Sequence, residues 1–170
     1  MHFEIQHTFD CELATFEGLF LEPEYLAFLE KNAPNVQKIE QLSREDQGAT
    51  VKRRVRYTPK PGAYKVGPKT VPSAWTNFEE ESTYDRERHA GRFANFPNIP
   101  HFIREKFTNT GTLTLTADGP GRVRRVIAGE IKVHIFLLGK IAERVIHKAG
   151  ADLIEQEAQA MRKYLAERRA

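Results

Sequence analysis

The sequence is poor in cysteine and has no long apolar run. Cys11 is the only cysteine among 170 residues, so no disulfide can form within the chain, which is typical of a reducing cytoplasm. Apolar runs such as Ile135 to Leu138 are far shorter than a membrane span. The opening MHFEIQHTF has neither the basic nor the apolar region of a signal peptide. We therefore expect a soluble, cytoplasmic protein.

Several catalytic and metal-binding motifs are also missing. The six histidines are scattered, without HxxxH or HExxH spacing, so no metal site is expected. The segment Asp118 to Gly121 reads as a hairpin turn between strands, which excludes a phosphate-binding loop before a helix. No serine has the flanking glycines of a nucleophile elbow, and no activating motif surrounds Cys11. We expect no cofactor and assign no catalytic residue.

The charge balance does not indicate nucleic acid. The chain has 26 Lys and Arg against 23 Asp and Glu, a formal net charge of +3. No RNP-like, KH or helix-turn-helix signature accompanies the arginines, and acidic residues are dense. Hydrophobic residues make up 40% and charged residues 29%, which is typical of a globular protein. We expect no nucleic-acid partner and a single domain over residues 1–170.

The N-terminal part predicts one strand followed by two short helices. Alternating apolar residues indicate a strand from Phe3 to Phe9, and Asp10 is a suitable N-cap for the helix after it. Pro23 suits the first turn of a second short helix, which ends at Asn32 to Pro34.

Six strands in three hairpins are predicted next. Their ranges are 36–43, 49–57, 75–85, 89–96, 108–116 and 123–135. The polar run Arg44 to Gly48 is the expected first turn. The segment 58–72 is rich in proline and glycine and cannot be a central strand. Residues 97–106 interrupt the pattern, with a helical turn near His101 to Lys106.

One long helix is predicted from about Gly139 to Arg168. Its apolar residues recur at helical spacing and form a stripe, which is typical of a helix that faces a core. Gly150 interrupts this stripe at a cost of about 1 kcal/mol relative to alanine. We expect a slight bend or a close approach to the sheet at Gly150.

The order of these elements indicates an α+β fold, because the strands follow one another instead of alternating with helices. It resembles the START-like (Bet v 1-like, or SRPBCC) superfamily, in the opening FEIQHTFDCELATFEGLFLEPEYLAFL and the ending GEIKVHIFLLGKIAERVIHKAGADLIEQEAQAMRKYL. The resemblance spans nearly the whole chain and is closest to a bacterial branch of uncharacterised domains.

The resemblance implies a helix-grip fold, in which a curved seven-stranded antiparallel sheet wraps around a long C-terminal helix, with two short helices between strands 1 and 2. It also implies a cavity between the sheet and that helix. Members of the superfamily bind lipids, sterols, polyketides or hormones, and some of them are enzymes.

Strand alternation nominates polar residues for the cavity side of the sheet. The candidate ligand-binding residues, each with apolar neighbours on its own face, are Arg53, Glu80, Tyr84, Arg125 and His7. A buried charge must be paired or must meet a ligand. We therefore expect Arg53 and Glu80 to face one another inside, and Arg125 or His7 to meet a polar head group. A bulge would shift the strand phase and place these groups in solvent instead.

Charge is segregated along the chain. Between Gln47 and Phe78 there are seven basic residues and no acidic ones, and five acidic residues follow from Glu79 to Glu87. The loop inside the basic stretch offers Tyr64, Val66 and Val71, with which it could dock on anionic lipid and open the pocket. We favour the alternative that the two stretches pair across neighbouring strands.

We predict a module that binds or transfers a hydrophobic small molecule or a lipid, with transient membrane-surface contact. Apolar burial would supply affinity, and one or two polar groups would fix the orientation. The first alternative is a cyclase, hydrolase or dehydratase that uses Glu80, His7 or Tyr84 as acid or base. Convergent unpaired acid and base groups would favour it, whereas a lone ion pair favours carriage. The second alternative is a protein-interaction module, which needs an exposed apolar patch instead of a pocket.

Overall fold

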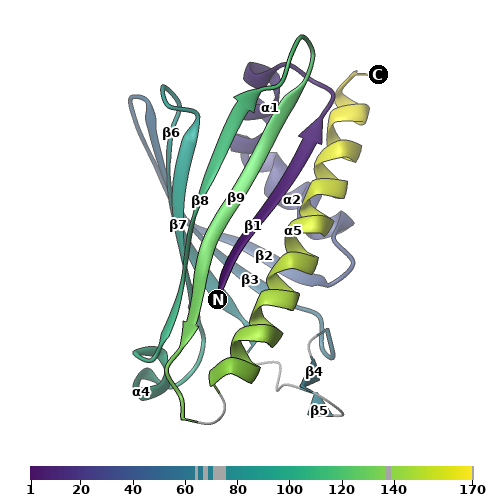
Figure 1. The fold of residues 1–170 in the computed structure, drawn as a ribbon. Coiled ribbons are helices and arrows are strands. Elements are labelled where there is room, and N and C mark those ends of the chain that lie inside the picture. Colours follow the sequence, from purple (N-terminus) through teal and green to yellow (C-terminus); the bar gives the residue numbers. More distant parts are fainter. Residues whose placement is uncertain (64, 67–68, 71–75, 137–138, 170) are drawn as a thin grey trace.

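Seven antiparallel strands form one curved sheet that wraps around a long C-terminal helix (Figure 1). The computed structural model describes the chain except residues 64, 67–68, 71–75, 137–138 and 170. The sheet strands are β1 (His2–Phe9), β2 (Val36–Gln47), β3 (Thr50–Pro59), β6 (Phe78–Asp85), β7 (Ala90–Pro97), β8 (Phe107–Ala117) and β9 (Val123–Val133). The helices are α1 (Leu13–Leu21), α2 (Pro23–Asn32), α4 (His101–Arg104) and α5 (Gly139–Arg169). This is the helix-grip α+β fold that the sequence predicts.

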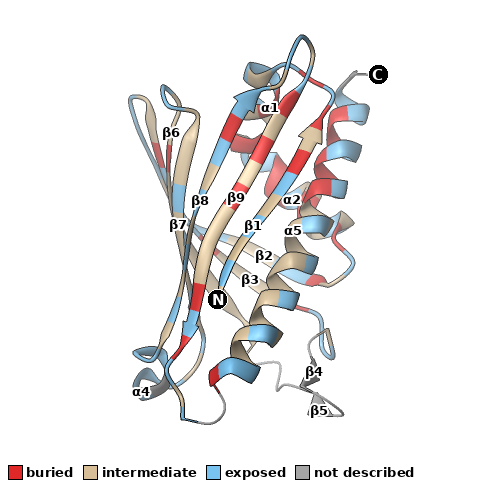
Figure 2. Ribbon diagram, in the orientation of Figure 1, coloured by how far each residue is buried: buried red, intermediate tan, exposed pale blue. Residues whose placement is uncertain are grey.

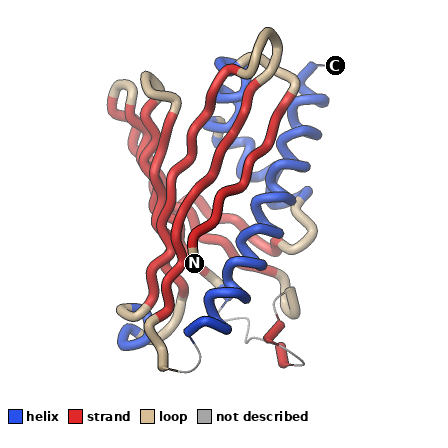
Figure 3. The backbone as a smooth tube through the Cα atoms, in the orientation of Figure 1, coloured by secondary structure: helices blue, strands red, loops and turns tan. Residues whose placement is uncertain are grey.

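The strand order across the sheet is β1-β9-β8-β7-β6-β3-β2. The hairpins pair in sequence, and β1 joins the sheet by pairing with β9. The tube in Figure 3 shows how the sheet curves past α5, which lies against its concave side. The segment after β3 carries a separate two-stranded sheet of β4 (Lys65–Val66) and β5 (Lys69–Thr70). It contributes no central strand, in agreement with its proline content.

Two local predictions are wrong. Asp10 does not cap α1, because the chain turns after β1 and the helix begins three residues later, with Glu12 at the N-cap position. Residues Arg44 to Gln47 do not form the first turn but continue β2, which leaves a tight turn at Gly48 with a φ of +58°. Their charged side chains lie in a solvent-facing hairpin, so the polar composition carried no information about where the strand ends.

Strand boundaries elsewhere differ by a few residues. The strand predicted from residue 75 begins at Phe78, and Trp75 itself lies outside the described residues. The last strand ends at Val133 rather than at Ile135. The register shifts of the β2–β3 pair lie in β2, between Val36 and Lys38 and again between Gln41 and Ser43. The phase of β3 is therefore the one that alternation predicts.

The densest part of the core lies around the C-terminal half of α5. There, Ala158 and Met161 are fully buried against aromatic residues such as Phe9 and Phe16. Figure 2 shows buried residues gathered at this end of the helix and few on its N-terminal half. The apolar stripe continues through that N-terminal half, but there it does not meet a packed core.

Candidate functional site

A cavity of about 660 Å³ lies between the sheet and the N-terminal half of α5. Most of its wall is apolar, and among the side chains that form it are Phe3, Leu29, Phe78, Phe93, Ile131 and Leu153. Part of the α5 stripe therefore lines a cavity, although the sequence pattern was that of a helix packed against a core.

Small residues on α5 leave this space open. Ala142, Ala149, Gly150 and Ala151 all line the cavity. A Cβ atom added to Gly150 would meet no other atom within 4 Å. The close approach to the sheet expected at Gly150 is therefore wrong, because the helix stands away from the sheet at this point.

The glycines on the sheet side make room for aromatic side chains of the wall. Gly111 and Gly129 lie opposite one another on β8 and β9. A Cβ atom on Gly111 would come within 2.5 Å of the Phe93 ring, and one on Gly129 within 2.8 Å of the Phe3 ring. The absence of side chains here lets both rings lie close against the sheet instead of filling the cavity.

The cavity reaches the surface near the start of α5. Ile141 lines the cavity and is also 49% exposed. Phe102 on α4 and Phe136 just before α5 are 69% and 88% exposed, and Figure 1 shows α4 and the start of α5 at the same end of the molecule. A backbone hydrogen bond of 2.8 Å from His134 to Lys106 joins the two segments. We call this end the mouth of the cavity.

Arg53 and Glu80 both line the cavity, on the face that alternation predicts. Arg53 pairs with Ser82, and Glu80 pairs with Val55, so the two side chains are diagonal neighbours on adjacent strands. No direct ion pair joins the two side chains in the described part of the chain. The Arg53 guanidinium instead lies over the Phe20 ring, 5.0 Å from its centroid, and donates to the Phe20 carbonyl at 3.5 Å.

Glu80 is a carboxyl group of the cavity wall with an altered acidity. Burial raises the pKa of Glu80 to about 7, and the negative charge of Glu157 adds to the rise, while Arg53 opposes it. Burial likewise raises the pKa of Tyr57 well above its usual value, with Glu80 contributing. Asn95 lies directly opposite Glu80 on β7, and its buried Oδ1 has no hydrogen-bond partner among the described residues. A short polar patch thus interrupts the apolar wall.

Arg125 is completely buried and does not line the cavity itself. Its Nη1 donates to Glu157 Oε2 at 2.9 Å, and its Nη2 lies 3.3 Å from Nδ1 of His7, its partner across β1 and β9. His7 Nε2 lies 3.0 Å from Glu155 Oε2. Of these four residues, Glu157 is the one in the cavity wall. Arg125 therefore fixes the side chain of Glu157 through a direct ion pair, and His7 in turn contacts Arg125.

Tyr84 lines the cavity, but its hydroxyl group is already bonded. It donates to Glu17 Oε1 at 2.6 Å, and the same oxygen lies 2.8 Å from His89 Nδ1. Burial and the bond to Glu17 raise the pKa of Tyr84 above its usual value. The tyrosine is thus a protonated donor fixed away from the polar patch.

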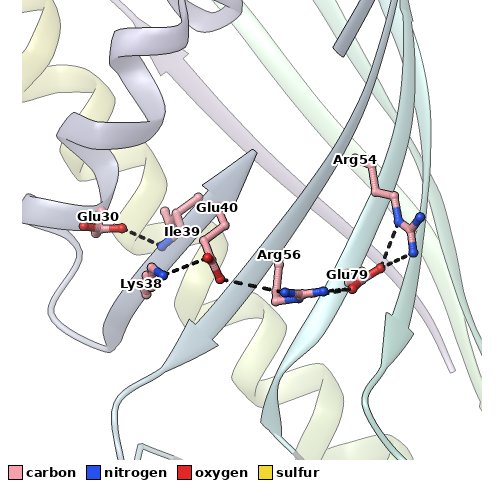
Figure 4. Close-up of polar contacts among 7 residues, drawn as sticks. All are labelled: Glu30, Lys38, Ile39, Glu40, Arg54, Arg56 and Glu79. Atoms are coloured by element: carbon pink, nitrogen blue, oxygen red, sulfur yellow. Dashed lines mark hydrogen bonds and ion pairs between the residues drawn. The ribbon is translucent and has the colours of Figure 1, made fainter. Parts of the chain in front are cut away.

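Two arginines of the basic stretch are paired across strands on the outer face of the sheet (Figure 4). Arg54 and Arg56, both on β3, donate to Glu79 on β6, at 2.5 and 2.7 Å. The hydrogen bonds from Arg56 and Arg54 hold the pKa of Glu79 below its usual value. Cross-strand pairing, the alternative that the sequence favoured, is confirmed for these two arginines.

The expected lipid-docking loop of this stretch involves residues outside the described part of the chain. Tyr64 and Val71 lie outside the described residues, as does the side chain of Val66. Within the described residues, no group of three His, Cys, Asp or Glu side chains is arranged to hold a metal ion. No described helix combines the length and apolar character that crossing a membrane requires.

A family model described as "Protein of unknown function (DUF2505)" matches residues 4–165. The chain belongs to this family. No curated protein matches it in sequence. The family match agrees with the expected branch of uncharacterised domains.

Solved structures share the fold at low sequence identity. Norcoclaurine synthase from Thalictrum flavum has a TM-score of 0.69 at 15% identity, covering 98% of this chain and 87% of that one. The Zhui aromatase/cyclase from Streptomyces sp. R1128 has a TM-score of 0.66 at 11% identity, with coverages of 97% and 95%. A START superfamily protein from Mycobacterium smegmatis has a TM-score of 0.54 at 10% identity, with coverages of 98% and 97%. The START-like fold is confirmed.

Sequence reasoning missed two members of the polar patch. Glu157 was not nominated because its place in the wall depends on how α5 is rotated against the sheet. Asn95 lies two residues after Phe93 on a predicted strand, and both residues line the cavity. The alternation that identified Glu80 could therefore also have identified Asn95.

Proposed function

We propose that residues 1–170 act as one cytoplasmic domain that binds or transfers an apolar small molecule or a lipid in this cavity. The supporting observation is the cavity itself, because about 660 Å³ lies within the usual range of small-molecule sites. Unfilled apolar space is destabilising, and a ligand with an apolar body would offset that cost. A pocket of this size also argues against a role as an interaction module alone.

The polar patch gives the ligand an orientation. Arg53 and Glu80 contact its polar end, while Arg125 and His7 act indirectly by fixing Glu157. Tyr84 contributes its ring to the wall, since Glu17 already accepts the hydrogen bond of its hydroxyl group. The five residues nominated from the sequence thus have different roles in this proposal.

The mouth is the entry route, and we place transient membrane contact there. Ile141 lines it, and the exposed Phe102 and Phe136 lie on segments at the same end of the molecule. Lys106 and Lys140 are also exposed on the same segments, and basic residues beside apolar ones favour an anionic lipid surface.

The enzyme alternative is supported by one observation. A carboxyl group with a pKa of about 7 inside a cavity suits a general acid or base at neutral pH, and the structural neighbours include a synthase and a cyclase. Carriage is the better supported of the two, because no second group with such acidity converges on Glu80 among the described residues. Arg53 stays protonated, and Tyr84 and His7 are engaged elsewhere.

Filling the cavity tests the proposed function. Gly150→Leu places a side chain into open cavity space, and Gly18→Leu is the matched control, because Gly18 is also helical, is exposed, and has no atom within 4 Å of its Cβ position. Native mass spectrometry of protein from its own source should show a co-purifying small molecule that is lost on denaturation. Gly18→Leu should retain it and Gly150→Leu should lose most of it.

Two results would argue against the proposal. One is a wild-type protein that remains free of ligand and gains no thermal stability from any of a panel of apolar compounds. The other is equal retention of ligand by Gly150→Leu and Gly18→Leu, which would place the bound molecule outside the cavity.

A further inference from the structure

The charged groups of the cavity are not all neutralised by one another. Glu157 has Arg125 as its partner at 2.9 Å. Arg53 and Glu80 have no oppositely charged group in direct contact among the described residues. In the cavity wall, Glu157 is therefore paired, whereas Arg53 and Glu80 beside it are available to a ligand.

Arg53 presents a positive charge that cannot be removed. A guanidinium group stays protonated in proteins and carries five N–H donors. The contacts of Arg53 in the described region are the Phe20 ring and the Phe20 carbonyl, the latter at a long 3.5 Å. Most of its donors are thus free to bind an acceptor, and the fork of a guanidinium matches a carboxylate in shape and charge.

The charge of Glu80 depends on the pH and on the charges beside it. With its pKa near 7 it is about half protonated at neutral pH. The charged and titratable groups that face it are Arg53 and Tyr57 from β3 and Glu157 from α5. Asn95 faces it from β7 without a charge. A negative charge brought beside Glu80 would favour its protonated form, which can donate a hydrogen bond.

We propose that the polar end of the ligand is an acidic group such as a carboxylate, which Arg53 binds and to which a protonated Glu80 donates a hydrogen bond. The inference rests on the proposed function of the cavity and names the class of its ligand. When an anion is bound, its negative charge neutralises Arg53, and Glu80 can remain protonated and uncharged. A cationic head group would instead face Arg53 in a site of low dielectric, where like charges are costly.

This arrangement couples ligand binding to proton uptake. At pH 6 free Glu80 is already protonated and the anion binds without further change. At pH 8 the carboxyl group must first take up a proton, so the affinity for an anion falls as pH rises through 7. Between pH 6 and 8 the expected decrease is about tenfold, the value for one proton taken up by a group with a pKa near 7.

Three amphiphiles with the same chain test the head group: dodecanoate, dodecanol and dodecylamine. Their dissociation constants are measured by calorimetry at pH 6, 7 and 8 with the full-length protein, at concentrations below micelle formation. Dodecanoate stays ionised in this range, since an ordinary carboxyl group has a pKa of about 4. At pH 6 dodecanoate should bind at least about tenfold more tightly than the other two compounds, and its affinity should fall about tenfold by pH 8.

Two variants separate the roles. Glu80→Gln keeps a neutral donor at all pH values, so dodecanoate binding should become independent of pH and stay at the pH 6 level. Arg53→Met should remove the preference for dodecanoate while dodecanol still binds. The control is Arg54→Met, since the neighbouring arginine points to the outer face and pairs with Glu79. Melting temperatures verify that each variant folds.

Each alternative outcome has a definite meaning. Equal affinity for dodecanoate and dodecanol, or tighter binding of dodecylamine, overturns the acidic ligand but leaves the cavity as a binding site. A preference for dodecanoate that persists in Arg53→Met, or a pH dependence that persists in Glu80→Gln, also overturns it. If none of the three amphiphiles binds, the proposed function for chain-like ligands fails as well.

Discussion

At the scale of single residues, Glu80 couples stability to pH. Its pKa rises from an ordinary 4.5 to about 7 on folding, so the folded state holds the proton more tightly than the unfolded chain. The contribution of Glu80 to folding stability is therefore fully present below about pH 4.5. It is lost as the pH rises through 7. Arg53, Tyr57 and Glu157 are the neighbouring charged and titratable groups that shape this behaviour.

Glu80→Gln should remove this destabilisation. A shift of this size corresponds to about 3 kcal/mol, so the variant should be more stable than wild type by up to that amount at pH 8. The difference should nearly vanish toward pH 4.5. Urea unfolding of both proteins across this range measures it. A constant difference at every pH would contradict the assigned acidity of Glu80.

Arg125 is buried for a structural reason, namely its ion pair with Glu157. Arg125→Met should cost about 3–5 kcal/mol of folding stability, because it leaves an unpaired carboxylate at the cavity wall. The double variant Arg125→Met with Glu157→Gln should recover much of that loss, since no charge remains to be satisfied. Chemical denaturation of the three proteins tests this, and a loss below about 1 kcal/mol in the single variant would argue against it.

At the scale of elements, α5 combines two tasks along one apolar stripe. Its C-terminal half packs into the core, and its N-terminal half, with small residues, bounds the cavity. Periodicity predicted the helix and its inward face. The pattern did not show what lies opposite that face, because an apolar side chain that lines a cavity and one that is packed in a core give the same sequence signal.

Gly150→Ala should stabilise the helix by about 1 kcal/mol. A methyl group at this position meets no atom within 4 Å, so only the gain in helix propensity remains. Gly18→Ala on α1 is the matched control, with the same expected gain on an exposed face. Thermal or urea unfolding measures both. Destabilisation by Gly150→Ala alone would mean that the sheet lies closer to α5 than the structure shows.

At the scale of the whole molecule, the exposed apolar residues Phe102, Phe136 and Ile141 lie at the end where the cavity opens. We expect the double variant Phe102→Ser with Phe136→Ser to bind anionic vesicles several-fold more weakly, because it removes two aromatic side chains that would enter the lipid interface. Co-sedimentation with vesicles containing phosphatidylserine, at two salt concentrations, measures this.

Leu42→Ser is the control for the vesicle experiment. Leu42 is 38% exposed on β2 and does not line the cavity. If both proteins bind vesicles as wild type does, the mouth is not a membrane contact. If the control is equally impaired, membrane binding does not depend on the mouth.

The amino-acid pattern by itself determined the order of the elements, the inward faces of the strands and the helix, and the inward position of Arg53, Glu80, Arg125 and His7. These features depend on local periodicity, which a strand or helix imposes on its own residues. Where charged residues continued a strand, as from Arg44 to Gln47, the same local signals placed the turn wrongly.

The tertiary structure alone decided which inward groups meet. Both Arg53 and Arg125 point inward, yet Glu157 of α5 neutralises Arg125, while Arg53 is left facing the cavity. That difference depends on how the helix is rotated and how far it stands from the sheet. Such distances are set by packing between segments far apart in the chain, 32 residues in the case of Arg125 and Glu157, so no local window of sequence contains them.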